Sequence, residues 1–250
     1  MLAETLVRAG HLLIGDHAPE GRDYWARRFW DRDEVESRPV LGDDFRAQKK
    51  KIAEYIETYG GDAARVIEIA CGTGEFTAMA ARSTAAKEIV AVDISEQALR
   101  IAGERVEHPG LTLRQGDFWA VDDLGTAPLV LCVDAVHHLG RVRKVLERLK
   151  TFVEPGGVFI GNLWTIDNYH DYQRTRYGAL QHLGRSALFL ANAVAMRATG
   201  GRVRWASYRT QLLPAKAVEP MLREVFDEVL GVHTTRFFVA FACRRSAGSS

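Results

Sequence analysis

A short apolar run closed by glycines, Arg65-Val66-Ile67-Glu68-Ile69-Ala70-Cys71-Gly72-Thr73-Gly74, comes directly before a stretch of helical character at residues 75–82. The run predicts a strand, because short apolar runs bounded by turn residues are typical of buried strands. Glycines at the end of a strand let the backbone approach a ligand closely, since no side chain blocks the way. We therefore expect a strand, a ligand-binding turn and a helix in succession.

The alternation of strands and helices continues after this turn. Further strands are predicted at residues 88–93, 111–115, 129–133 and 158–163, and helices at 95–107 and 141–152. Strands that are almost continuously apolar and alternate with helices indicate a parallel sheet covered on both faces. Right-handed crossovers between them make the fold doubly wound.

The last third of the chain breaks this rhythm. Residues 167–199 read as helical, and a further helix is predicted at 215–226 before two strands at 229–233 and 237–243. A short turn separates these two strands, so they should pair antiparallel. The expected fold is therefore α/β, with a doubly wound seven-stranded sheet of six parallel strands and an antiparallel last strand. N-terminal helices and a helical insertion after the fifth strand complete it.

Composition excludes several classes of protein. The 250 residues include 33 Lys and Arg against 32 Asp and Glu, so the basic surface typical of duplex-binding proteins is absent and no nucleic-acid partner is expected. Three isolated cysteines and no Cys/His cluster predict neither a disulfide framework nor a metal site. No apolar segment reaches the roughly 20 residues that span a bilayer, and no convincing signal peptide is present. A cytoplasmic protein without a membrane partner is expected.

Acidic residues stand where three of the predicted strands end. Glu68 lies on the first strand, Asp93 ends the second and Asp117 follows the third. A carboxylate at the end of the second strand can accept two hydrogen bonds from the vicinal diol of a ribose. The third position of a dinucleotide-type glycine motif holds Thr77, and Glu75 follows the turn, where it disfavours a phosphate but tolerates a sulfonium cation.

These features resemble class I S-adenosylmethionine (SAM)-dependent methyltransferases of the small-molecule type. The run 68–74 is similar to motif I of that family, 129–139 to its motif IV, and 153–158 to the turn before its fifth strand, so the resemblance covers residues 64 to 165. It implies a Rossmann-like core with S-adenosyl-L-methionine as cofactor. The implied cofactor-binding residues are Glu68, Ala70, Gly72, Gly74, Asp93, Ile94, Asp117, Phe118 and Val133.

The resemblance also implies a division of the single domain, residues 1–250. The Rossmann-like core would comprise 64–165 and 203–245, a helical lid region 1–60, and a helical insertion on the substrate side 166–202. Aromatic residues at 24–30 and in the insertion fit either a lid that closes over the site or ordinary core packing. The segment 188–196 is apolar on nearly all sides of a helix, so we expect it to be buried against the domain, a second subunit or a lipophilic substrate.

Histidines are the candidates for catalysis. His137 and His138 follow the fourth strand, and His170 lies in the insertion. A base is required only if the acceptor is a hydroxyl or a protonated amine, and a ring packed beside the cofactor is the other interpretation of each. The sequence predicts methyl transfer to N or O of a small molecule, such as a secondary metabolite, by a monomer or homodimer. Methylation of a peptide N-terminus, a nicotinamide-dependent oxidoreductase and a cofactor-binding regulator remain as alternatives.

Overall fold

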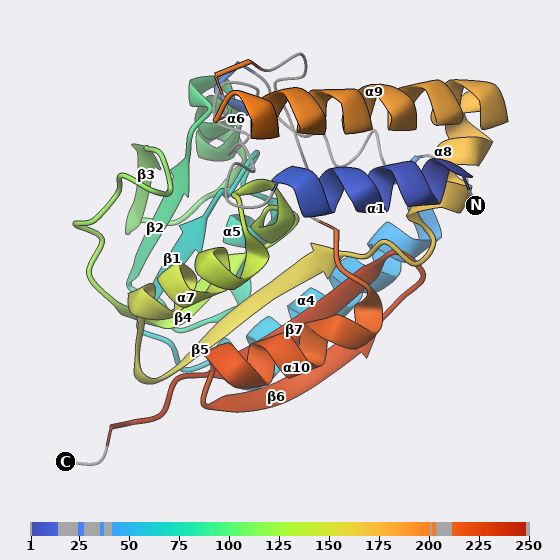
Figure 1. Cartoon of the computed structure of the whole chain (residues 1–250). Helices are drawn as coiled ribbons and strands as arrows, with labels where there is room; N and C mark the ends of the chain where they lie inside the picture. The colour runs from blue at the N-terminus through green and yellow to red at the C-terminus, as the bar shows by residue number, and fades with distance from the viewer. Residues whose placement is uncertain are drawn as a thin grey trace.

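The computed structural model describes residues 2–14, 25–27, 36–37, 42–200, 202–203 and 212–248. Its centre is a seven-stranded sheet with the order β3-β2-β1-β4-β5-β7-β6 (Figure 1). The strands are β1 (Arg65–Ile69), β2 (Glu88–Asp93), β3 (Leu111–Gln115), β4 (Ala127–Cys132), β5 (Val153–Trp164), β6 (Glu228–Thr234) and β7 (Phe238–Arg244). β7 pairs antiparallel with both β5 and β6, whereas the pairs among β1 to β5 are parallel. The predicted sheet is confirmed.

Helices cover both faces of the sheet. On one face α7 (Val142–Phe152) and α10 (Ala215–Val225) pack on side chains such as Ile67 and Val130. On the other face α4 (Gly42–Gly60) and α5 (Glu75–Ser83) pack on Val66 and Leu131. Successive strand residues point to opposite faces, so a strand packed on both sides must be apolar at every position. This explains the unbroken apolar runs in the sequence.

The fifth strand differs from the expectation. It begins at Val153, five residues before the predicted start, because Val153 pairs with Ala127 on β4 ahead of a register shift. The residues expected to form a turn are therefore an irregular part of the strand. The helix α6 (Glu96–Arg105) begins as predicted, since the Ser95 hydroxyl accepts a hydrogen bond from the backbone N–H of Ala98 at 3.3 Å.

The helical insertion forms α8 (Tyr169–Tyr177) and α9 (Ala179–Ala198), separated by Gly178 with a φ of 77°. α9 lies beside α1 (Leu2–Ile14), and the two form a layer set apart from the sheet at the top of Figure 1. The segment 188–196, expected to be buried against the domain, a second subunit or a lipophilic substrate, is only partly covered by the domain. Only one side packs against the molecule, and Leu180 and Leu188 on the other side are 86% and 56% exposed. No helix in the described ranges is both long and apolar enough to cross a bilayer.

One aromatic residue of the insertion, Tyr172, belongs to a small core with Phe45, Phe237 and Phe238. Trp164 packs on Tyr172 and Phe238, with ring centroids 5.9 and 5.4 Å apart, and Tyr172 packs on Phe237. Of the N-terminal aromatic segment, residues 25–27 are described, whereas Tyr24 and residues 28–30 lie outside the described residues.

Candidate functional site

A cavity opens at the carboxyl ends of β1 to β4. Open α/β sheets bind their ligands at this edge, where the loops after several parallel strands meet. The structure brings nine of the predicted site residues to its walls: Glu68, Ala70, Gly72, Asp93, Ile94, Asp117, Phe118, Val133 and His138. Gly74, His137 and His170 do not line it.

The glycine turn between β1 and α5 has a left-handed backbone. Ala70 and Gly72 have φ values of 56° and 55°, a region that residues with side chains rarely adopt. A Cβ atom on Gly72 would meet no atom within 4 Å, so this position faces open space at the cavity. The turn therefore presents bare backbone to a ligand, as the sequence predicted.

Gly74 has a different structural role from Gly72. Its φ is 79°, and a Cβ atom there would lie 2.9 Å from Cβ of Ala102 and 3.0 Å from Cγ2 of Val106. Both of these contacts come from α6 and its C-terminal end. Gly74 thus allows α5 to approach α6 closely, and it supports the turn without lining the cavity.

Asp93, at the end of β2, connects the glycine turn after β1 with the turn after β2. Its Oδ2 accepts a hydrogen bond from the backbone N–H of Gly72, and its Oδ1 accepts one from Ser95, each at 2.8 Å. Burial raises the pKa of Asp93, and the backbone N–H donors oppose this rise. A carboxylate has about four lone-pair sites, so it can accept further bonds from a ligand in the cavity.

Glu68 lies behind the glycine turn and is 1% exposed. Burial raises the pKa of Glu68 to about 8, the hydroxyl of Thr77 lowers it by donating a hydrogen bond, and the neighbouring charge of Asp93 raises it. Because the Thr77 hydroxyl is engaged with Glu68, the third position of the glycine motif is part of the buried support of the turn. A pyrophosphate-binding motif would have a glycine at this position.

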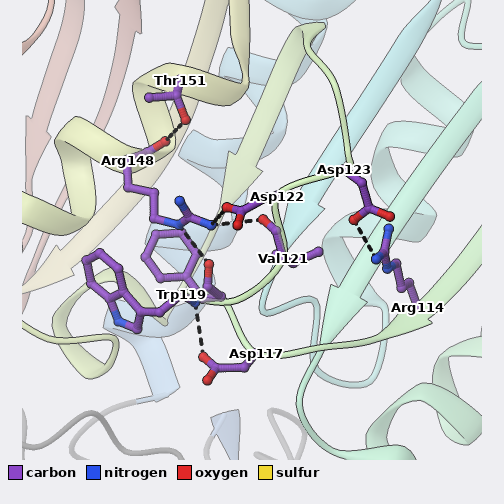
Figure 2. A network of polar contacts seen from close by, with 9 residues as sticks. Arg114, Asp117, Trp119, Val121, Asp122, Asp123, Arg148 and Thr151 are labelled. Carbon is purple, nitrogen blue, oxygen red and sulfur yellow. Dashed lines mark hydrogen bonds and ion pairs between the residues drawn. The ribbon is translucent and has the colours of Figure 1, made fainter.

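The loop after β3 is held from two sides, as Figure 2 shows. The carboxylate of Asp117 accepts a hydrogen bond from the backbone N–H of Trp119 at 3.0 Å. From α7, Arg148 donates to the carbonyl oxygens of Phe118 and Val121 at 2.8 and 2.9 Å, and its guanidinium lies 5.4 Å from the centroid of the Phe118 ring. These contacts keep Asp117 and Phe118 at the cavity wall.

Trp119 is a cavity residue that the sequence reasoning missed. Its indole N–H donates to the carbonyl oxygen of Leu139 at 2.8 Å and so joins the loop after β3 to the loop after β4. Only its position next to Phe118 could have suggested it, because its partner lies 20 residues further along the chain.

Asp134, directly after β4, is the second missed residue. It lines the cavity with a φ of 57°, and its Oδ1 accepts hydrogen bonds from Asn162 at 2.7 Å and from Gln48 at 2.8 Å. Its backbone N–H donates to the side-chain oxygen of Asn162 at 2.6 Å, and Asn162 and Gln48 are fully buried. A strained backbone over-determined by its surroundings is characteristic of functional sites. No local sequence signal points to these partners.

The two adjacent histidines face different surroundings. His138 lines the cavity, where its ring lies 5.3 Å from that of Trp25. His137 is 2% exposed and turns toward the backbone N–H of Trp164 and its ring. Burial lowers the pKa of His137 to about 3 and also lowers the pKa of His138, so both rings are neutral near pH 7. Of the pair, His138 is the one placed to act on a ligand.

His170 lies away from the cavity, on α8. Its Nδ1 is 3.1 Å from Nε2 of His182 on α9, and burial lowers the pKa of both rings. The pair joins the two helices of the insertion. The structure thus separates His170 from the other candidate catalytic residues.

The side chains that line the cavity include several acids. Among the described residues that line it there is no Lys or Arg, and there are five carboxylic acids: Glu68, Glu75, Asp93, Asp117 and Asp134. Glu75 is paired with Lys49 of α4. The raised pKa of Glu68 keeps that carboxyl largely protonated near pH 7, but the remaining acids, with no basic residue among the described lining, favour a ligand that carries positive charge over a phosphate.

Residues 66–157 match the family model described as a methyltransferase domain. This segment is similar to methyltransferase domains. The match spans β1 to the start of β5, and it therefore includes every strand whose end borders the cavity. The predicted family resemblance is confirmed over this segment.

Two curated relatives match parts of this chain. An uncharacterized protein of Synechococcus is 33% identical over 99 residues, which are 38% of this chain and 24% of that protein. A malonyl-[acyl-carrier protein] O-methyltransferase of Halalkalibacterium halodurans is 24% identical over 124 residues, 48% of this chain and 46% of that enzyme. The chain thus spans about a quarter and about half of the lengths of these relatives.

The fold extends beyond the matched segment. The N-methyltransferase NodS of Bradyrhizobium japonicum, in a crystal structure with S-adenosyl-L-homocysteine, superposes with a TM-score of 0.54 over 85% of this chain and 95% of NodS. The sequences are 14% identical, so the likeness concerns the fold alone. The methyltransferase domain and the elements around it therefore share one architecture with that enzyme.

Proposed function

We propose that this chain binds S-adenosyl-L-methionine and transfers its methyl group to a nitrogen or oxygen atom of a small molecule. The observation that carries this proposal is the acidic cavity at the carboxyl ends of β1 to β4, bordered by a bare glycine turn and lined by no Lys or Arg among the described residues. SAM carries a sulfonium and an ammonium group, which such a cavity favours, and it lacks the phosphates that the cavity disfavours.

Each wall of the cavity suits one part of the cofactor. The Asp93 carboxylate can accept hydrogen bonds from the ribose hydroxyls, beside Ile94. Asp117 and Phe118 can contact the adenine, through a hydrogen bond and through ring packing respectively. Glu68, Ala70, Gly72 and Val133 are placed to surround the methionine portion, with Gly74 supporting the turn from outside.

When bound, SAM would supply a methyl group from its sulfonium sulfur, and the sulfur would leave as a neutral thioether. The residues of the chain then have to orient the acceptor and exclude water, which can lower the barrier by roughly 7–11 kcal/mol when two reactants are held in near-attack geometry. His138 is neutral, so a nitrogen of its ring can accept a proton from a hydroxyl or amine acceptor at the cavity. We do not assign such a role to His137 or His170, because neither lines the cavity.

The segments outside the core would select the acceptor. Trp25, from the N-terminal region 1–60, lines the cavity next to His138, which supports a covering role for this region. The insertion 166–202 would form the remaining substrate side of a single domain whose core is 64–165 and 203–245. We place the enzyme in the cytoplasm as a monomer or homodimer with a small-molecule acceptor and no nucleic-acid partner, given its nearly balanced charge.

Two other activities are weaker candidates. A nicotinamide-dependent oxidoreductase would need a turn that receives a pyrophosphate, and the acidic lining opposes this. A methyltransferase acting on a peptide N-terminus would use the same cofactor cavity and differ only in the acceptor.

Isothermal titration calorimetry with SAM, S-adenosyl-L-homocysteine and NAD tests the cofactor. We expect the first two to bind and Asp93→Ala to weaken SAM binding by about 1.5–3 kcal/mol, the usual contribution of hydrogen bonds to a charged group. Asp123→Ala is the matched control, because Asp123 is an exposed acid paired with Arg114 outside the cavity. Binding of NAD without SAM would overturn the assignment.

The acceptor can be sought by mass spectrometry of a metabolite extract incubated with the protein and methyl-labelled SAM. A small molecule that gains one labelled methyl group supports the proposed substrate class. Label found only on peptide N-termini would favour the alternative acceptor.

A further inference from the structure

Charge is distributed unevenly along this chain. Residues 172–218 contain seven arginines and one lysine but no Asp or Glu, although the whole chain is balanced with 33 basic and 32 acidic residues. The stretch includes α9 and most of α8. The helical insertion 166–202 holds five arginines and two aspartates, so it carries net positive charge in a protein whose net charge is close to zero.

α9 differs from an ordinary surface helix in having apolar residues on its outer side. Its buried residues are His182, Ser186, Asn192, Ala193 and Met196. Its outer side consists of apolar or small residues at helical spacing: Leu180, Gly184, Ala187, Leu188, Ala191 and Val194. All six are exposed. An apolar stripe along a helix of 20 residues is unusual on a free surface and marks an interaction site.

Cations border this apolar face. Arg185 and Arg197 of α9 and Arg202 just beyond it are exposed, and in the described part of the chain none of the three contacts a carboxylate. Arg185 lies over the ring of Tyr177, 4.4 Å from its centroid. The face therefore combines exposed leucines with positive charge that is not neutralised by the described acids.

We propose that the outer face of α9 docks this protein on an anionic lipid bilayer. A helix with one apolar side, flanked by arginines and lacking acids, binds at the lipid headgroup level through apolar burial and attraction to anionic lipids. The expectation of no membrane partner depended on the absence of a segment long enough to span a bilayer. A helix that lies in the plane of the interface has no such length requirement.

Charge disfavours a second copy of the chain as the occupant. A two-fold interface through α9 would bring two identical cationic insertions together. Like charges held across an interface oppose association, whereas an anionic lipid surface complements them. Figure 1 also shows α1 and α9 at one end of the molecule, opposite α10 and β6.

Vesicle flotation of the full chain tests the proposal. The probes are vesicles of phosphatidylcholine alone and vesicles of phosphatidylcholine mixed with phosphatidylglycerol, each at low and at high salt. We expect binding to the mixed vesicles that falls as salt rises. The double variant Arg197→Gln and Arg202→Gln should bind roughly 25-fold more weakly, about fivefold for each cation removed near the surface. Leu180→Gln with Leu188→Gln should also lose most of the binding.

The matched control is Arg100→Gln with Arg223→Gln, which removes the same charge from exposed positions on α6 and α10 and should leave binding unchanged. SAM titration and urea unfolding of each variant show whether it is folded. Absence of binding to mixed vesicles, or binding that is the same for both vesicle types, overturns the proposal. A dimer in analytical ultracentrifugation that the two leucine changes dissociate, without vesicle binding, would assign the face to a second copy.

Discussion

Replacement of Glu68 by Gln tests whether the acid behind the glycine turn is protonated in the folded protein. The carboxyl is buried, and its pKa rises from the ordinary value of 4.5 to about 8. A group whose pKa is raised on folding binds more protons in the folded state than in the unfolded state. Its contribution to stability is therefore complete below about pH 4.5 and is lost as the pH rises toward 8.

The magnitude follows from the width of this window. Each pKa unit corresponds to about 1.4 kcal/mol, so between about pH 5 and pH 7 the free energy of unfolding of the wild type should fall by up to about 3 kcal/mol from this group alone. Glutamine has the shape of the protonated acid, and its side-chain oxygen can still accept the hydrogen bond from Thr77. Glu68→Gln should thus be nearly neutral at pH 5 and increasingly stabilising toward pH 8.

Urea denaturation of both proteins across this pH range measures the difference. Glu104→Gln is the control, since Glu104 is an exposed acid paired with Arg100 on α6 and should show no comparable trend. A difference in unfolding free energy between wild type and Glu68→Gln that stays constant from pH 5 to pH 8 would refute the reasoning. The carboxylate would then be ionised in the folded state throughout.

Three further outcomes follow from the geometry of the site. Gly74→Ala should lower the unfolding free energy by about 2–4 kcal/mol, because a positive φ and a close contact with Ala102 both oppose a Cβ atom; thermal unfolding measures this, and an unchanged midpoint would contradict it. Gly72→Ala meets no protein atom, so we expect a smaller loss of about 1–2 kcal/mol but clearly weaker SAM binding in calorimetry. His138→Ala should reduce turnover more than SAM affinity in steady-state kinetics, whereas His137→Ala should chiefly reduce stability; equal turnover of His138→Ala and wild type would exclude His138 as a base.

Local sequence patterns were sufficient to predict the sheet and much of the cavity. Apolar runs specify strands, and strand ends followed by glycine or acid specify turns, so the positions of Gly72, Asp93 and Asp117 could be assigned without coordinates. Because all parallel strands end at the same edge of the sheet, residues at their ends must converge there.

Other features depend on contacts between distant parts of the chain. Asp134 is held by Asn162, 28 residues away, and by Gln48, 86 residues away, and no local pattern encodes such a pairing. The same holds for the roles of Gly72 and Gly74, which look alike in the sequence but differ in what surrounds their Cα atoms.

The sequence by itself determined the order of strands and helices and the edge of the sheet at which a ligand binds, because both follow from the spacing of apolar and turn residues. Only the tertiary structure decided which side of α9 faces inward. A segment that is apolar on nearly all sides specifies no packing direction, so the inward side of α9 depends on contacts with distant elements such as α1 and His170 of α8. Because the opposite side of α9 packs inward, its apolar outer side is exposed.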